Sequence, residues 1–312
     1  MIKNIAAQKL TQTKYGLGTL NTLTTFGTAN QFILERSFEL LAWYEDLLTI
    51  NRAQSQVLAI SMAAGKKPVQ VSEPVYQLIK MAVTASQANF GFNAAIGPLV
   101  KLWDIGFDDA HVPSTTEIQR CCKLIDPTQI QLDDRNFSVY LPQPGMKLDL
   151  GGIAKGYIAD RIKDLWQAYG VGAGIINLGG NVLLLGTAPT HTDGRWVIGV
   201  QDPRQPRGIN VGEVILPACS AVTSGIYERS LKQNGRSYHH LLDPRTGYPL
   251  ETDLAGVTIF AEKSVVAEIE AKRLFFAGQP LPNWLQSRPG LLGAVFVYQD
   301  GRVIPVGVKL RK

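Results

Sequence analysis

Apolar residues recur at helical spacing in several stretches of the chain. Residues three or four positions apart share one face of an α-helix, so this period predicts helices with one buried side. Two of the stretches also carry start signals: Ser72 precedes Glu73 and Pro74, and Ser114 stands three residues before Glu117. The helices expected from these patterns cover residues 31–50, 72–88, 114–122, 154–169 and 263–277.

Other stretches have the short apolar runs and turn residues that are typical of β-strands. A threonine-rich alternation predicts a strand at 17–30, and two hairpins are expected at 130–141 and 291–308. Residues 201–210 are rich in Pro, Arg and Gly, which favours a surface loop. The further strands are expected at 174–177, 181–186 and 195–200, with a strand pair at 213–222 and 237–242. Helices combined with mainly antiparallel strands predict an α+β fold.

Composition places the chain among ordinary globular proteins with a sizeable core. It has 312 residues, of which 45% are hydrophobic and 18% are charged. The net charge is +5, and the charges are scattered along the chain without a run of like charges. This mild basicity gives no reason to expect nucleic acid as a partner, whereas an anionic small ligand or an acidic protein fits it well.

Cysteine usage and the N-terminus bear on the cellular compartment. The cysteines are Cys121, Cys122 and Cys219, an odd number without a CxxC pair, which argues against a disulfide framework and a structural zinc site. Residues 1–9 lack a long apolar run. We therefore expect neither a signal peptide nor a membrane span, and a cytoplasmic location.

The first segment with candidate chemistry is LDLGGIAKGYIAD, residues 148–160. It is expected to form the end of a buried strand, a glycine turn and the start of a helix. Its small residues allow a ligand to approach the main chain closely. Asp149 and Lys155 place charges on either side of the turn. A charged ligand held against the main chain fits this make-up, and a plain strand-to-helix connection is the alternative.

Two more segments combine glycine with polar side chains. Asn177-Leu178-Gly179-Gly180-Asn181 offers two amides, but by itself it is better explained as a type I′ hairpin turn. Residues 222–229, which include Ser224, Gly225 and Arg229, suit a phosphate or carboxylate. The end of a strand with a solvated rim explains this second segment equally well.

The fourth segment, residues 238–249, holds His239 and His240, half of the histidines of the chain. A histidine titrates near neutral pH and can serve as a general base or acid, although a pair of histidines on a strand is more often structural. In the turn that follows, Asp243 can bond its own main chain and Gly247 can adopt positive φ.

Two other interpretations fail, one on the order of its elements and one on its motif. Residues 170–174, Gly-Val-Gly-Ala-Gly, follow an expected helix and precede a strand, the reverse of a dinucleotide-binding turn. Ser224, His240 and Asp243 could be drawn as a hydrolase triad, but Thr-Ser-Gly-Ile is not a Gly-x-Ser-x-Gly elbow.

Taken together and in this order, LDLGGIAKGYIAD, INLGGN, AVTSGIYER and YHHLLDPRTGYP resemble the FAD:protein FMN transferase family, also called the ApbE family. Weaker matches extend the likeness over about residues 15–308, among them the run Gly91–Val100. The resemblance implies a single flavin transferase domain over residues 1–312. It also implies mainly antiparallel strands packed with helices in two intertwined subdomains.

Members of this family transfer the FMN part of FAD to a threonine or serine hydroxyl of a target flavoprotein and release AMP. A magnesium ion usually lies at the FAD diphosphate. The resemblance implies that His240 deprotonates the acceptor hydroxyl and that the carbonyl group of Ala154 faces the metal. The residues implied in binding FAD are Phe92, Asn93, Asp149, Gly151, Gly152, Lys155, Tyr157, Ser224 and Gly225.

The chain departs from the family at the metal ligands. Glu268 stands where the family has an aspartate, and Lys272 stands where it has a threonine. Ser61 also replaces a usual asparagine. Glu268 and Lys272 have the i, i+4 spacing of a helical ion pair, so the Lys272 ammonium is a candidate substitute for the metal. Alternatively, Glu268 and diphosphate oxygens still hold magnesium. A catalytically impaired flavin-nucleotide-binding protein is therefore the second functional hypothesis.

Overall fold

The computed structural model describes residues 8–27, 30–50, 52, 54–206, 208–227, 229–233 and 235–312. Positions 28 and 29 of the strand expected at 17–30, Arg207 in the expected loop and Glu228 in the third motif lie outside this description. The chain forms two compact units. Unit 1 contains Met1–Glu45, Ile153–Ser224 and Leu254–Lys312, and unit 2 contains Asp46–Gly152 and Gly225–Asp253. Each unit is therefore assembled from segments far apart in the sequence.

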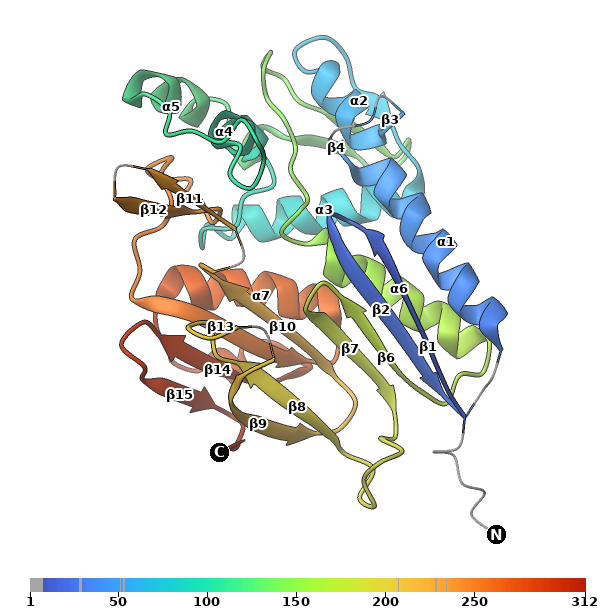
Figure 1. Cartoon of the computed structure of the whole chain (residues 1–312). Helices are drawn as coiled ribbons and strands as arrows, with labels where there is room; N and C mark the ends of the chain where they lie inside the picture. The colour runs from blue at the N-terminus through green and yellow to red at the C-terminus, as the bar shows by residue number, and fades with distance from the viewer. Residues whose placement is uncertain are drawn as a thin grey trace. The chain divides into compact units, whose positions relative to one another are not determined.

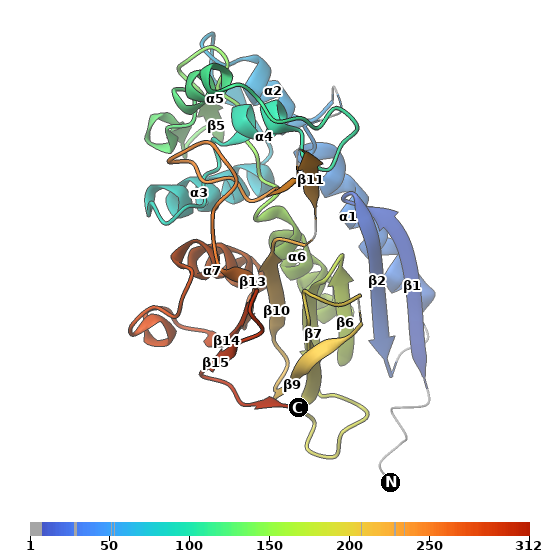
Figure 2. The same ribbon diagram turned by 60° about the vertical axis from the view of Figure 1, so that its left-hand side comes forward.

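An eight-stranded sheet forms the centre of unit 1, in the order β1-β2-β6-β7-β10-β13-β14-β15. The registered pairs of this sheet are antiparallel, as the sequence predicts. Figure 2 shows β1 and β15 at its two edges. The strands are β1 (Lys9–Gly16), β2 (Thr19–Phe26), β6 (Ala173–Leu178), β7 (Asn181–Gly186), β10 (Ser220–Gly225), β13 (Leu254–Ala261), β14 (Leu291–Tyr298) and β15 (Val303–Val306).

Helices α6 (Ala154–Ala168) and α7 (Ser264–Ala277) pack side by side on one face of this sheet (Figure 1). Helix α1 (Gln31–Leu48) begins in unit 1, and its Ser37 hydroxyl accepts a hydrogen bond from Trp166 Nε1 of α6 at 2.8 Å. Helix α7 is buried on nearly every side, so even its charged Glu268 and Glu270 are buried. Such carboxylates need polar partners in the interior.

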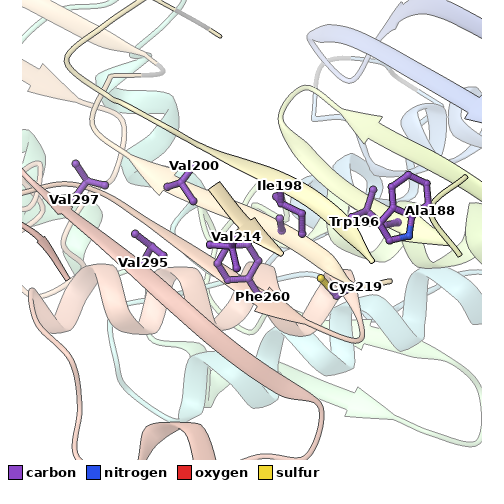
Figure 3. Close-up of a cluster of buried hydrophobic side chains, with 11 residues drawn as sticks. Ala188, Trp196, Ile198, Val200, Val214, Cys219, Phe260, Val295 and Val297 are labelled. Carbon is purple, nitrogen blue, oxygen red and sulfur yellow. The ribbon is translucent and has the colours of Figure 1, made fainter. Parts of the chain in front are cut away.

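The other face of the sheet is covered by a three-stranded sheet made of β8 (Trp196–Gln201), β9 (Asn210–Leu216) and β16 (Leu310–Arg311). Side chains of β8 and β9 pack against β13 and β14 in one apolar layer, with Trp196 beside Ala188 at one end and Val297 at the other (Figure 3). Phe260 in this layer is 0% exposed. Burying a side chain of this size contributes roughly 1.5–3 kcal/mol to stability.

Unit 2 is built from short helices, small sheets and long connections. A second apolar cluster around Leu99, Trp103 and Ile118 forms part of its core. Its helices are α2 (Gln56–Met62), α3 (Glu73–Gln87), α4 (Gly97–Trp103) and α5 (Thr115–Cys122), with the 3₁₀ turn η2 (Pro127–Gln129). Its strands are β3 (Val69–Gln70), β4 (Gln131–Asp133), β5 (Ser138–Tyr140), β11 (Ser230–Gln233) and β12 (Arg236–His239).

Most expected helices are confirmed, whereas several strand expectations are wrong. The Ser114–Glu117 capping box is present at α5, and Ser72 precedes α3. The expected strand at 17–30 is instead β2 of a hairpin with β1. The stretch 213–222 divides between β9 and β10, while β12 pairs with β11. Strand β13 was not expected because all eight of its residues are buried and show no alternation.

Candidate active site

The first motif contains a tight turn but no paired strand. Leu148 and Leu150 are buried as expected, yet the segment is joined to its neighbours by an isolated bridge between Ile96 and Lys147. The Asp149 N–H donates to the Ala94 carbonyl at 2.8 Å. The Asp149 carboxylate accepts a hydrogen bond from the Gly151 N–H, also at 2.8 Å. This carboxylate therefore closes the turn from which the chain enters α6 at Ala154.

Burial within unit 2 makes the ionisation of the Asp149 carboxyl unfavourable. The surrounding protein desolvates its carboxyl and raises the pKa, although the residue keeps part of its surface exposed. The Gly151 N–H and the Arg229 guanidinium oppose this effect and lower the pKa, but burial outweighs both. A carboxylate that is costly to ionise yet sits in a glycine turn is typical of a functional position.

In unit 1, Gly156 allows α6 and α7 to approach closely. A Cβ atom at this position would lie 2.5 Å from the Ser264 carbonyl oxygen and 2.6 Å from Glu268 Cγ. One turn further along α6, the Asp160 carboxylate accepts hydrogen bonds from the N–H groups of Ser264 and Val265, at 2.9 and 3.0 Å. Asp160 thus caps the start of α7 from a neighbouring helix.

These contacts fix the relative direction of the two helices. Gly156 lies against Ser264 and Glu268, while Asp160, one turn later on α6, binds the N–H group of Ser264 at the start of α7. The two helices therefore run antiparallel. The first turn of α6 consequently lies beside the α7 turn from Ser264 to Glu268.

A buried polar network links the second motif to α7. Asn181 Nδ2 donates to Glu268 Oε1 at 2.9 Å, while the Ser264 hydroxyl donates to Asn181 Oδ1 at 2.8 Å. The Lys272 ammonium contacts Glu268 Oε2 directly. Side-chain exposure is 6% for Glu268 and 12% for Lys272. The ion pair expected from the i, i+4 spacing is confirmed, and it lies in the interior.

The turn of the second motif is also confirmed. Gly179 and Gly180 join β6 to β7 with φ values of +61° and +98°, the pattern of a type I′ turn. Asn177 Oδ1 accepts the Gly180 N–H at 2.8 Å. Asn181 then points its amide to α7, a role that a hairpin turn alone does not supply.

The remaining site residues of unit 1 are mostly buried. Ala154 and Tyr157 are 8% and 7% exposed, and the Tyr157 ring meets the edge of Tyr44 at 5.7 Å between ring centroids. Lys155 is half-buried in the first turn of α6, and Ser224 is buried in β10. Their role in binding FAD stays a prediction, and for Tyr157 the packing on Tyr44 already explains its burial.

The two neighbouring histidines of unit 2 have different partners. His239 Nε2 lies 2.8 Å from the Leu250 carbonyl, and its Nδ1 accepts the Leu241 N–H at 3.2 Å. Burial lowers the pKa of this imidazole. His240 Nδ1 lies 3.3 Å from the Arg229 carbonyl. A carbonyl oxygen only accepts, so Nδ1 of neutral His240 carries the proton and Nε2 carries the lone pair that a general base needs.

The turn after the histidines is built as the sequence predicts. The Arg245 N–H donates to Asp243 Oδ1 at 3.0 Å, and the Arg245 side chain binds both carboxylate oxygens. Gly247 has φ +76°, and its carbonyl accepts a hydrogen bond from Trp103 Nε1 at 2.8 Å. Because Asp243 binds Arg245 while His240 Nδ1 binds a main-chain carbonyl, the Asp–His pair of a hydrolase triad is not formed.

Phe92 and Asn93 line an open pocket of about 220 Å³ in unit 2. Asn93 Nδ2 donates to the Ile125 carbonyl at 2.7 Å, and Asn93 Oδ1 accepts the Ala95 N–H at 2.8 Å. The side chain of Asn93 therefore shapes the pocket wall. The pocket is completed by Ser86 of α3, Cys122 of α5, Arg245 of the Asp243–Gly247 turn, and Asn89 and Asp126 of connecting segments.

The comparisons with known proteins agree with these motifs. The ApbE family model matches residues 17–296. The chain belongs to the ApbE family. The FAD:protein FMN transferase of Klebsiella pneumoniae strain 342 is 47% identical to it over 80% of this chain and 77% of the relative. The enzyme of the same name from Treponema pallidum is 37% identical, covering 86% and 78%.

A solved ApbE structure shares the fold. The ApbE protein of Thermotoga maritima superposes with a TM-score of 0.86 at 29% identity, covering 96% of this chain and 97% of that protein. The α+β ApbE-like fold expected from the sequence is confirmed. In this member of the family, helices long and apolar enough to cross a bilayer are absent from the described ranges.

The side chains at the implied metal position of this ApbE chain do not form a ligand set for a divalent metal ion. Both oxygens of Glu268 already face donors, Asn181 Nδ2 and the Lys272 ammonium. A protonated lysine cannot be a metal ligand. Within the part of the chain that the structure describes, no group of three or more His, Cys, Asp or Glu side chains is positioned to hold an ion. The ligand set implied for magnesium therefore does not fit.

The structure adds contacts between functional candidates that the sequence patterns did not reveal. Asn181, Ser264 and Asp160 connect α6, α7 and the β6–β7 turn. Asn181 and Asp160 lie inside two of the motifs, so membership of those motifs was the available signal. Their partners stand more than eighty residues away along the chain, and sequence spacing could not reveal them.

Proposed function

We propose that this chain transfers the FMN part of FAD to a threonine or serine hydroxyl of a target flavoprotein, with release of AMP. The observation that carries this proposal is the family match over residues 17–296, together with relatives at 47% and 37% identity that are named FAD:protein FMN transferases. We further propose a single functional domain over residues 1–312, and the cytoplasmic location stays a prediction.

In the proposed reaction, the acceptor hydroxyl oxygen attacks the phosphorus on the FMN side of the FAD diphosphate. A new P–O bond forms, the P–O bond to the AMP phosphate breaks, and AMP leaves with that electron pair. A threonine or serine hydroxyl is a weak nucleophile until a base takes its proton. His240 fits this task because its Nδ1 proton is directed to the Arg229 carbonyl, which leaves the lone pair on Nε2.

The other residues would bind and orient FAD. The Gly151–Gly152 turn and the first turn of α6 offer main-chain N–H groups, and a helix N-terminus favours anionic phosphates. Lys155, Ser224 and Gly225 would add polar contacts, while the pocket at Phe92 and Asn93 would take a ring of the dinucleotide. Asp149 supports these roles by closing the turn through Gly151.

Magnesium, when bound in this family, supplies positive charge at the diphosphate. Ala154, Glu268 and Lys272 are the positions implied for that site, but the Glu268–Lys272 pair is unsuitable as a ligand set. For this reason we derive no step through a metal ion. The same pair favours the second candidate function, a flavin-nucleotide-binding protein with slow or absent transfer, because one ammonium carries half the charge of magnesium.

A labelling experiment distinguishes the transferase from the flavin-nucleotide-binding protein. The purified chain is mixed with FAD and an acceptor protein of the Klebsiella pneumoniae relative, and the flavin is followed by fluorescence on a denaturing gel. A covalent flavin band with equimolar AMP supports transfer. Bound FAD without a band supports the binding protein, and a protein that fails to bind FAD contradicts both.

A further inference from the structure

The Glu268–Lys272 pair is built into the interior of unit 1. It lies on α7, with 6% and 12% side-chain exposure. Asn181 Nδ2 donates to Glu268 Oε1, the carboxylate oxygen that does not contact Lys272. The Ser264 hydroxyl in turn donates to the Asn181 amide oxygen. An exposed helical pair of this spacing contributes little to stability. A buried one must satisfy nearly all of its polar groups, and this network does so for Glu268.

The position of the ammonium follows from the helix packing. Glu268 Cγ lies over Gly156, where only a hydrogen atom separates the two helices. Asp160 holds the start of α7 through two main-chain N–H groups, which prevents α7 from sliding along α6. Because α7 runs antiparallel to α6, Lys272, one turn beyond Glu268, lies toward the N-terminal end of α6. The helix packing therefore directs a cation toward the start of α6.

We infer that Lys272 is a built-in cation for the FAD diphosphate, so that FAD binding by this chain does not require a divalent metal ion. The inference rests on the proposed function. An ammonium has three donors and binds phosphate oxygens as a point charge. Glu268 would position Lys272, and the Asn181 amide would keep Glu268 in place.

The experiment measures FAD affinity by quenching of flavin fluorescence in EDTA and in millimolar MgCl₂, and the metal content of the FAD-loaded protein. For the natural chain, we expect the two affinities to agree within about twofold and the protein to hold no stoichiometric metal. Lys272→Met should weaken FAD binding in EDTA by about tenfold or more, since a charge-assisted contact is lost.

Matched variants distinguish the effect of the Lys272 charge on FAD affinity from an effect on folding. Lys272→Arg keeps a cation and should keep metal-independent binding. Lys272→Thr removes the ammonium and supplies a hydroxyl, so we expect its FAD affinity to fall in EDTA and recover in part with MgCl₂. Lys263→Met removes an exposed lysine just before α7 and should change neither affinity. Thermal unfolding of each variant shows whether the fold is retained.

Three results would overturn the inference. The first is loss of FAD binding by the natural chain in EDTA, with one bound magnesium ion per protein in MgCl₂. The second is FAD affinity of a folded Lys272→Met variant equal to that of the natural chain in EDTA. Either leaves the transfer activity intact as a proposal. The third, a natural chain that binds FAD in neither buffer, would contradict the proposed function as well.

Discussion

The polar groups on α6 and α7 are buried and bind one another, whereas those around His240 are partly exposed and held by main-chain atoms. Asp160, Asn181 and Glu268 each have side-chain or helix-end partners in unit 1. His240 in unit 2 lies after a short hairpin and is oriented by the Arg229 carbonyl. Groups of the first kind suit a fixed charge, while groups of the second kind suit a proton transfer that needs access to a substrate.

The strongest test of this comparison removes the base. His240→Ala should lower the rate of flavin labelling by about 10²–10⁴-fold, because the acceptor hydroxyl would keep its proton. FAD affinity and thermal unfolding should change little, since His240 keeps part of its surface exposed. The labelling rate is measured by gel fluorescence at saturating FAD.

His111→Ala is the matched control. His111 is an exposed histidine of the same unit, and its Nδ1 also lies near a main-chain carbonyl, that of Asp109 at 3.0 Å. Equal losses in the two variants, or unchanged labelling by His240→Ala, would remove His240 from the mechanism.

The next largest effect is expected at the close approach of the two helices. Gly156→Ala places a Cβ 2.5 Å from a main-chain oxygen of α7, so the helices must separate. Overpacking of this kind costs about 1–3 kcal/mol in the free energy of unfolding. Urea unfolding measures it, and the same separation should weaken FAD binding by displacing Glu268.

Gly172→Ala provides the comparison within unit 1. A Cβ at Gly172 meets no atom within 4 Å. Its free energy of unfolding should stay within about 0.5 kcal/mol of the natural chain. If Gly156→Ala also left the free energy of unfolding unchanged, the close packing of α6 on α7 would be contradicted.

The smallest effects are two pH dependences of opposite sign in unit 2. Burial raises the pKa of Asp149, so ionisation costs the folded state stability as pH rises through the folded pKa. Asp149→Asn removes this cost and can still accept the Gly151 N–H. The variant should be at least as stable as the natural chain at pH 7, and the difference should vanish below about pH 4.

Asp243 should behave in the opposite way. Burial alone would raise its pKa, but the hydrogen bonds and charge of Arg245 outweigh burial and lower the pKa. Ionised Asp243 therefore stabilises the fold above the ordinary carboxyl pKa, and this stability is lost as pH falls through the folded pKa. Asp243→Asn should cost up to about 1 kcal/mol at pH 7, because Arg245 is largely exposed. Thermal unfolding across pH compares the two variants, and shifts of the same sign would contradict the assignment.

Local signals in the sequence determined much of this protein. Helical periodicity and capping residues predicted α1, α3, α5, α6 and α7, because the hydrogen bonds of a helix join residues four positions apart. The two glycines of the β6–β7 turn and the Asp243–Gly247 turn followed from residues that tolerate positive φ. The i, i+4 spacing of Glu268 and Lys272 predicted their ion pair, and the order of the four motifs indicated the family.

Only the tertiary structure decided what lies next to these elements. Strand β13 has no alternating pattern because both of its faces are covered, and the neighbours of β10 are set by pairing across long stretches of chain. The burial of Glu268 depends on Asn181, 87 positions away, and on a glycine of α6 that lets α7 approach. Such contacts arise from packing between distant segments, which spacing along the chain does not encode. For that reason, a pattern typical of a solvated ion pair becomes an interior charge in the folded protein.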